Sequence, residues 1–231
     1  ALVLLWLALL AGVAAALWFL PRATITLRPA TRAAQVIVPV TADAELTAPN
    51  LDAAIVPARP VTETLAWEAG GPGTDAVARQ SVRALALQAL GAAAEERLAA
   101  RLNAGERLVP GSARLVVAEE QFATAAGRTR LTLQAELSGL AVAEADLVRL
   151  VAPPLAAALP PNFAADPATP RLDLEPGVGD GVFIVTARAT GRAMLDTASL
   201  SRQLVGQHMA EAAAALNGLP LAEPPRFDGR A

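Results

Sequence analysis

Few residues in this chain are of the types that act as catalytic nucleophiles or metal ligands. Its 231 residues include one histidine, His208, and no cysteine. Zinc sites usually combine cysteine with histidine, and a Ser-His-Asp triad needs a histidine beside an activated serine. No serine lies in a Gly-x-Ser-x-Gly turn, which exposes such a nucleophile in many hydrolases. We therefore interpret His208 as a surface residue near the start of a helix.

Two glycine-rich segments need to be separated from phosphate-binding loops. Residues 177–181 read Gly-Val-Gly-Asp-Gly, but a dinucleotide loop opens a helix, whereas a strand is expected after this segment. Residues 70–73 read Gly-Gly-Pro-Gly and lack the lysine of a P-loop. We interpret the first segment as a hairpin loop and the second as a break between two elements.

Charge and aromatic content argue against several classes of ligand. The adjacent pairs Glu95-Glu96 and Glu119-Glu120 are predicted to diverge into solvent, because neighbouring side chains on a helix or strand point apart. The net charge is −3 and aromatic residues make up 3 % of the chain, which disfavours phosphate backbones and stacking platforms. The sequence predicts no enzymatic activity, no cofactor, no metal, no nucleic acid and no small-molecule substrate.

The first twenty residues form an apolar stretch in which only Gly12 is outside the apolar set. As a helix, residues 1–20 would be about 30 Å long, which matches the hydrocarbon core of a bilayer. The alternative is a signal peptide with a cleavage site near residues 13–15. We predict a transmembrane anchor over residues 1–21, because the stretch is longer than a typical signal core.

Several side chains of this segment are predicted to have roles in the membrane. Aromatic and basic residues at its end would lie at the headgroup level, and small residues would allow close helix packing. The predicted interface residues are Trp18, Phe19 and Arg22, and the predicted helix-packing residues are Ala11, Gly12, Ala15 and Ala16.

These residues imply a location at the cell membrane as a single-pass protein. Arg22, Arg28 and Arg32 follow the apolar stretch and favour a cytoplasmic domain by the positive-inside rule. A basic segment before Ala1 would reverse that orientation. We expect an extracytoplasmic domain.

Beyond the apolar stretch, the patterns predict strands and then a long helix. Residues 22–73 are expected to be β-rich, because apolar side chains alternate there with polar ones. Residues 74–104 are expected to be one helix, capped by Thr74 with Asp75 in its first turn. Residues 218–231 hold several prolines and are expected to be an extended tail.

Residues 105–217 contain an internal similarity. Ala135 matches Ala187, Gly139 matches Gly191 and Ala141 matches Ala193 at one constant spacing. The interpretation is a duplicated strand-turn-strand-helix unit, and the alternative is chance similarity between alanine-rich segments. The predicted fold class is therefore α+β: one N-terminal transmembrane helix, a small β-rich segment, a long helix and two ββα repeats.

Five short segments carry a likeness to a known family. They are residues 23–31 (ATITLRPAT), 55–59 (IVPAR), 108–112 (LVPGS), 142–147 (VAEADL) and 204–207 (LVGQ). In order and spacing the chain resembles the baseplate J-like proteins, which comprise phage baseplate wedge components and membrane-anchored bacterial relatives. It departs from them in a short insert before the long helix and in lacking a proline-rich C-terminal signature.

The resemblance implies a structural protein that assembles with copies of itself or with a larger complex, and it implies no reaction. The function predicted is a membrane-anchored, non-enzymatic assembly protein whose partners are the lipid bilayer and copies of itself or other envelope proteins. Residues 105–217 would supply the lateral contacts. The alternative is a single-pass accessory subunit of a respiratory, photosynthetic or secretory complex.

Overall fold

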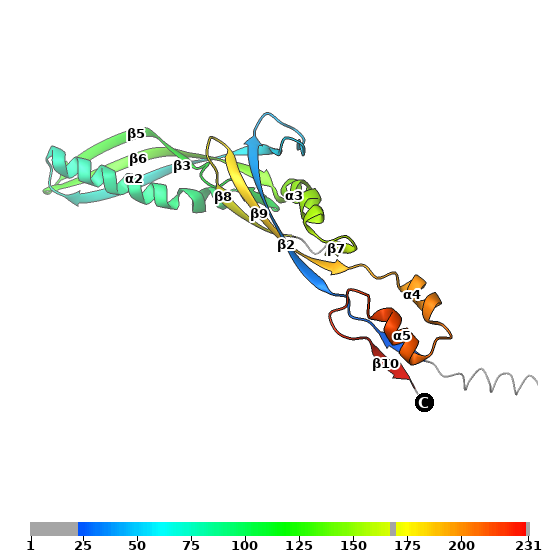
Figure 1. Ribbon diagram of the computed structural model, residues 1–231. Coiled ribbons are helices and arrows are strands. Elements are labelled where there is room, and N and C mark those ends of the chain that lie inside the picture. Colours follow the sequence, from blue (N-terminus) through cyan, green and yellow to red (C-terminus); the bar gives the residue numbers. More distant parts are fainter. Residues whose placement is uncertain (1–22, 167–169, 230–231) are drawn as a thin grey trace, which may run out of the picture. The chain divides into compact units, whose positions relative to one another are not determined.

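The computed structural model describes residues 23–166 and 170–229, which form an α+β fold with ten strands and four helices (Figure 1). The chain divides into two compact units. Among the described residues, the larger unit comprises residues 33–160, 165–166 and 170–190. The smaller unit comprises residues 23–32, 161–164 and 191–229.

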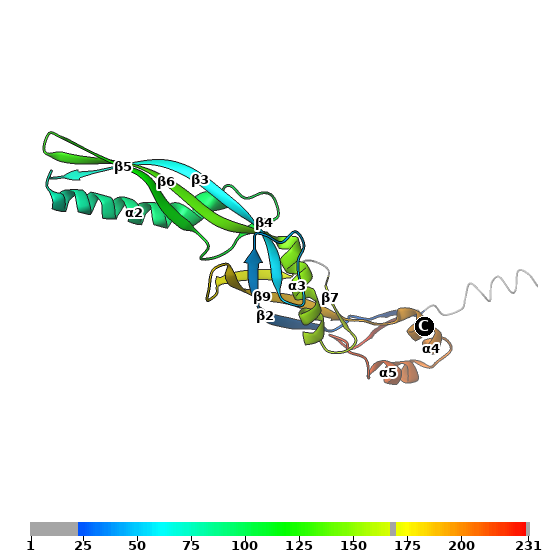
Figure 2. The ribbon, with the colours of Figure 1, turned by 90° about the horizontal axis from the view of Figure 1, so that it is seen from above.

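A three-stranded antiparallel sheet and one long helix make up much of the larger unit. The strands are β3 (Ile55–Pro72), β5 (Arg114–Ala125) and β6 (Arg128–Ala143), and the helix is α2 (Ala76–Ala99). Both views of the ribbon show α2 lying along this sheet (Figures 1 and 2). We call residues 58–72 of β3 together with β5, β6 and α2 the arm.

Strand β6 is the central strand of the arm. It pairs with β3 from Ala58 opposite Val142 to Pro72 opposite Arg128. On its other side it pairs with β5, with a register shift between Val117 and Glu119. β4 (Glu106–Leu108) pairs with the last residues of β6.

The core of the arm follows from two sequence periods. On β6, alternate residues Leu131, Leu133, Ala135 and Leu137 are fully buried, because successive side chains of a strand point to opposite faces. On α2, every fourth residue faces them, since such residues share one face of a helix. The buried residues of α2 are Val82, Ala86, Leu90, Ala94 and Leu98.

The start of α2 depends on local polar contacts and on glycine. Asp75 is the N-cap, one residue later than the predicted Thr74, and its side chain accepts a hydrogen bond from the Ala78 backbone N at 2.8 Å. Gly71 of β3 lies so close to α2 that a Cβ there would be 2.7 Å from Cγ2 of Val82. Its missing side chain therefore lets the helix pack against the strand.

Further strands and one helix complete the larger unit. β2 pairs in parallel with β3 from Thr41 opposite Ile55 to Asp43 opposite Pro57. The sheet order is β4-β6-β3-β2-β9-β7, with β8 on β9. β2, β7 and β9 contribute residues to both units. The remaining bounds are β2 (Thr31–Asp43), α3 (Glu144–Ala158), β7 (Phe163–Ala165), β8 (Arg171–Pro176) and β9 (Val182–Ala193).

The smaller unit combines a two-stranded sheet with two short helices. These are β1 (Ala23–Thr26), β10 (Arg226–Gly229), α4 (Thr197–Leu204) and α5 (Met209–Leu216). β1 and β10 are antiparallel, with Ile25 opposite Phe227. Part of the segment expected to be an extended tail is thus a strand, and it pairs with the same chain.

The helices of the described residues contradict the prediction of a single-pass membrane protein. None of them is long and apolar enough to cross a membrane. The longest, α2, carries charged side chains in its first and last turns, including Arg79 and Arg97. Residues 1–21, to which the anchor was assigned, lie outside the described residues. The described residues therefore do not support a transmembrane helix or a single-pass membrane location.

Each predicted copy has the expected order of strand, turn, strand and helix, β5-β6-α3 and β8-β9-α4-α5, but the two copies do not form one duplicated ββα domain. The elements of the first copy, β5, β6 and α3, all belong to the larger unit, whereas α4 and α5 of the second copy belong to the smaller one. The matched alanines, glycines and their neighbours lie on β6 and β9, and Ala135 and Ala187 are both fully buried. Both strands are flanked by others in the sheet, so similar packing demands explain the similar pattern.

Candidate interaction surface

The arm has one face covered by α2. No described element covers the opposite face over residues 128–136 of β6, and beyond them the turn between β8 and β9 reaches it, where Arg114 of β5 pairs with Asp180. The buried leucines of β6 point toward α2, so the residues between them point to the opposite face. Among these, Arg128, Arg130, Gln134 and Glu136 are exposed and Thr132 is half-buried. We call this opposite side the open face of the arm.

The neighbouring strands supply mostly short or polar side chains to the open face. A residue opposite an outward residue of β6 lies on the same face, because paired residues in an antiparallel sheet share a side. From β3 and β5 these residues are Thr64, Ala66, Glu68, Gly70, Val116, Glu119, Gln121, Ala123 and Ala125. A face of this composition is nearly flat, except where the longer side chains of arginine and glutamate extend from it.

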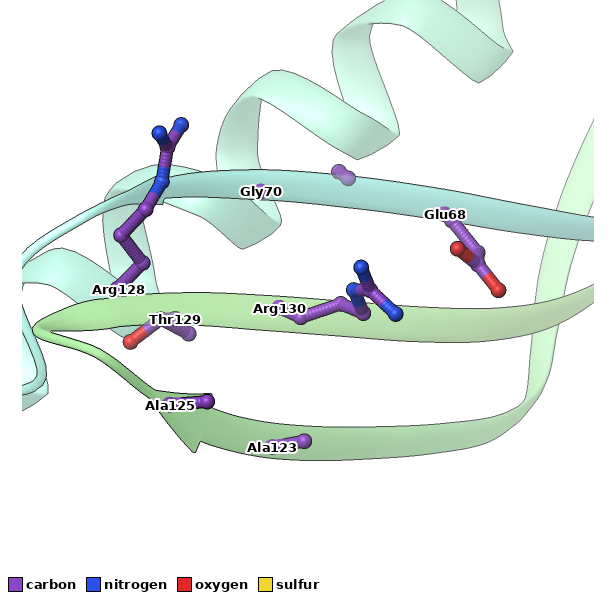
Figure 3. A pocket seen from close by; sticks show the side chains of 8 residues that line it. Glu68, Gly70, Ala123, Ala125, Arg128, Thr129 and Arg130 are labelled. Atoms are coloured by element: carbon purple, nitrogen blue, oxygen red, sulfur yellow. The ribbon is translucent and has the colours of Figure 1, made fainter.

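A hollow of about 530 Å³ lies on this face near the hairpin that joins β5 to β6 (Figure 3). Gly70 of β3 and Ala123 and Ala125 of β5 form part of its lining and leave it shallow. Arg128 and Arg130 rise from β6 beside it. The hollow is therefore open to solvent and bordered by two guanidinium groups and by the carboxylate of Glu68.

Arg128 and Arg130 form no ion pair or side-chain hydrogen bond with any described residue, whereas Arg83 of α2 pairs with Glu120 at 2.9 Å. Arginine stays protonated at every physiological pH and presents a planar donor set that fits a carboxylate. The two side chains thus place unpaired positive charge at the hairpin end of the open face.

The opposite charge lies farther along the same face. Glu136 of β6 and Glu119 of β5 are exposed and also form no ion pair with a described residue. Glu136 is eight residues from Arg128 on one strand, which corresponds to about 26 Å. Two unpaired bases thus lie at the hairpin end of the open face and two unpaired acids lie farther from it, while Glu68, which lines the hollow beside Arg130, is a third unpaired acid.

Both long edges of the arm are free among the described residues. β5 pairs only with β6, and β3 pairs beyond Pro57 only with β6. Free edges present unpaired backbone donors and acceptors to other chains. The register shift between Val117 and Glu119 interrupts one of them, as bulges on protected edges do.

The structure locates the other residues that the sequence singled out. The membrane-interface and helix-packing residues lie outside the described residues. His208 is exposed and is the N-cap of α5, where Glu211 accepts a hydrogen bond from its backbone N at 3.4 Å. Residues 177–181 join β8 to β9, with Gly177 N donating to Val182 O at 3.0 Å, so the hairpin interpretation is confirmed.

The acidic pair on β5 diverges as predicted. Glu119 is opposite Gln134 and lies on the open face, whereas Glu120 is opposite the buried Leu133 and reaches Arg83. Arg128 and Arg130 were not among the residues that the sequence singled out. Their signal was present, because two arginines alternate with inward residues at the start of a strand whose next inward residues are leucines.

The described residues contain no group of three or more side chains suited to hold a metal ion. Comparison of the chain with protein-family models, curated proteins and solved structures finds no match.

Proposed function

We propose that this chain is a non-enzymatic structural protein that assembles with copies of itself through the open face of the arm. The observation that carries the proposal is the distribution of unpaired charge on that face. Arg128 and Arg130 lie at the hairpin end, Glu119 and Glu136 lie farther along the strands, and Glu68 lies beside Arg130. Arg128 and Glu136 cannot pair within a single chain, because they are about 26 Å apart along β6.

Two further features support an assembly role. The free edges of β3 and β5 offer additional backbone contacts to neighbouring chains. The resemblance of the sequence to baseplate J-like proteins, which rests on the order of short segments, points to the same class of function. Association by such a surface is expected to be electrostatic, so salt should weaken it.

The test is the mass of the full chain in solution. Sedimentation equilibrium in a mild non-ionic detergent, which keeps the apolar residues 1–20 from aggregating, should show concentration-dependent association. Raising the salt from about 0.05 M to about 0.5 M shortens the screening length severalfold and should shift the equilibrium toward monomer. A chain that stays monomeric at every concentration and at low salt would contradict the proposal.

A further inference from the structure

We propose that two copies dock their open faces antiparallel to each other about a two-fold axis at Thr132. In this arrangement Arg128 and Arg130 of each copy meet Glu136 and Glu119 of the other. The inference rests on the proposed function and names the partner, the surface and the orientation.

The charge order along β6 is the first argument. Over residues 128–136 its outward residues are Arg128, Arg130, Thr132, Gln134 and Glu136, with Thr132 at the centre of this stretch, and Ser138 and Leu140 continue the same side toward the turn between β8 and β9. Reversing the strand about this centre places Arg128 opposite Glu136 and Arg130 opposite Gln134. The stripe is thus complementary to its own reverse, which is the condition for an isologous two-fold contact.

The neighbouring strands extend this match. A two-fold axis that lies between the sheets and across the strands places β5 over β5, and Gln121, opposite Thr132 in the register, lies on the axis. Glu119 of one copy then lies over Ala123 of the other, one strand away from Arg130. Packed sheets are about 10 Å apart, a gap that arginine and glutamate side chains can span together.

The hollow near the hairpin receives the acidic side chains of the second copy. Ala123 and Ala125 have short side chains and Gly70 has none, so a carboxylate can approach the two guanidinium groups from above the sheet. A bidentate arginine–carboxylate contact is stronger than a neutral hydrogen bond. The shape of the hollow and its two guanidinium groups therefore favour a carboxylate, whereas Glu68, which also lines the hollow, opposes it.

The alternative face-to-face arrangement is disfavoured by charge. With the axis along the strands, β6 of both copies would run in the same direction. Arg128 and Arg130 would then meet their own counterparts, and so would Glu136. Like charges placed opposite each other across an interface are repulsive.

One pair opposes the proposed arrangement. Glu68 is opposite Thr132 in the register and therefore lies on the axis, where it approaches Glu68 of the second copy. Replacing it by glutamine removes this repulsion without changing the size of the side chain. Glu68→Gln should tighten the dimer by about threefold or more, in line with a modest like-charge term.

The experiment uses charge reversal in the full chain. The hairpin-end variant carries Arg128→Glu and Arg130→Glu, and the acid-end variant carries Glu119→Arg and Glu136→Arg. Each alone should dimerise at least about tenfold more weakly than the unmodified chain, because like charges now face each other at both ends. An equimolar mixture should recover the affinity, since each copy then faces its complement. One chain carrying all four substitutions should also recover it.

The control reverses two glutamates of α2, Glu95→Arg and Glu96→Arg, which are exposed on the helix that covers the other face. It makes the same change in net charge as the acid-end variant and should leave the affinity within about twofold, as expected of charges remote from an interface. Circular dichroism of each variant checks that the fold is kept.

The outcomes separate the two proposals. If the unmodified chain associates and neither reversal weakens it, this docking is wrong, and another surface such as the β5 edge mediates assembly. If both reversals weaken association but neither the mixture nor the four-substitution chain restores it, the antiparallel orientation is wrong. If the unmodified chain does not associate at all, the proposed function itself fails.

Discussion

Arg59 and Glu106 form a bidentate ion pair between strands that flank β6, with Arg59 Nε 2.9 Å from Glu106 Oε1. The backbone N of Asn103 also donates to Glu106 Oε2 at 2.7 Å. These contacts lower the pKa of Glu106 to about 2, chiefly through the hydrogen bonds from Arg59 and secondarily through Asn103 and the charge of Arg59, against the opposing effect of desolvation. The pair links β3 to β4 at the end of the arm away from the hairpin.

This pair predicts a specific dependence of stability on pH. Because the folded-state pKa of Glu106 is below its ordinary value of 4.5, the native state binds fewer protons than the unfolded state. The stabilisation that the Arg59–Glu106 ion pair gives to the native state is therefore complete above pH 4.5 and is lost as the pH falls toward 2. Urea unfolding of the unmodified chain and of Glu106→Gln should show a stability gap at neutral pH that closes over this range.

The companion control is Glu96→Gln, which removes an exposed carboxylate of α2 that has no ion pair among the described residues. It should match the unmodified chain at neutral pH. A gap for Glu106→Gln that stays constant down to pH 2 would show that the ion pair is not its source.

A second prediction concerns the packing of α2 on β3. Gly71→Ala places a Cβ 2.7 Å from Cγ2 of Val82, a buried side chain. The resulting overpacking should lower the free energy of unfolding by about 1–3 kcal/mol. Gly91→Ala is the matched control, because Gly91 lies on the exposed side of α2 with nothing within 4 Å of its Cβ position. It should raise stability by about 0.5–1 kcal/mol. Equal effects of the two substitutions would argue against this packing.

A third prediction follows from Glu63, an inward residue of β3. Its side chain is 9 % exposed, its Oε1 lies 3.2 Å from Arg101 Nη2, and its Oε2 is buried without a hydrogen bond. Arg101→Ala should destabilise the arm by about 1 kcal/mol, a modest value because the guanidinium is largely exposed. In a Glu63→Met background the same substitution should have almost no effect, since no buried carboxylate is left. A double-mutant cycle by urea unfolding measures the difference, and additive effects would contradict the coupling.

Local features of the fold were accessible from the sequence. Alternation over residues 129–141 and the spacing of Val82, Ala86 and Leu90 predict a strand and a helix because burial imposes those periods. The hairpin at residues 177–181 was accessible for a similar reason, since its glycines permit turns that other residues resist.

Long-range features were not accessible. The pairing of Pro72 with Arg128 joins segments far apart in sequence, and no local pattern encodes it. The apparent repeat misled because β6 and β9 are both flanked strands that need small inward residues such as Ala135 and Ala187. The open face was missed because outward residues become a surface only when the neighbouring strands are known.

We expect self-association to be most sensitive to charge on the open face of the arm. Sedimentation velocity at increasing salt should show that the effect of salt on dimerisation is reversed in the hairpin-end variant. Salt should weaken the unmodified dimer but relieve repulsion in the variant, because screening acts on both attraction and repulsion. A variant that responds to salt as the unmodified chain does would argue against charged contacts at this face.

The most direct measurement places one thiol at the proposed axis. The chain has no cysteine, so Thr132→Cys gives a single reactive site, and a short bismaleimide joins two such sites only when they are close together. Docking about this axis predicts efficient cross-linking of Thr132→Cys into dimers at low salt and little cross-linking of Glu96→Cys on α2. Cross-linking of the two variants to the same extent, or none at residue 132 in a sample that sedimentation shows to be dimeric, would contradict it.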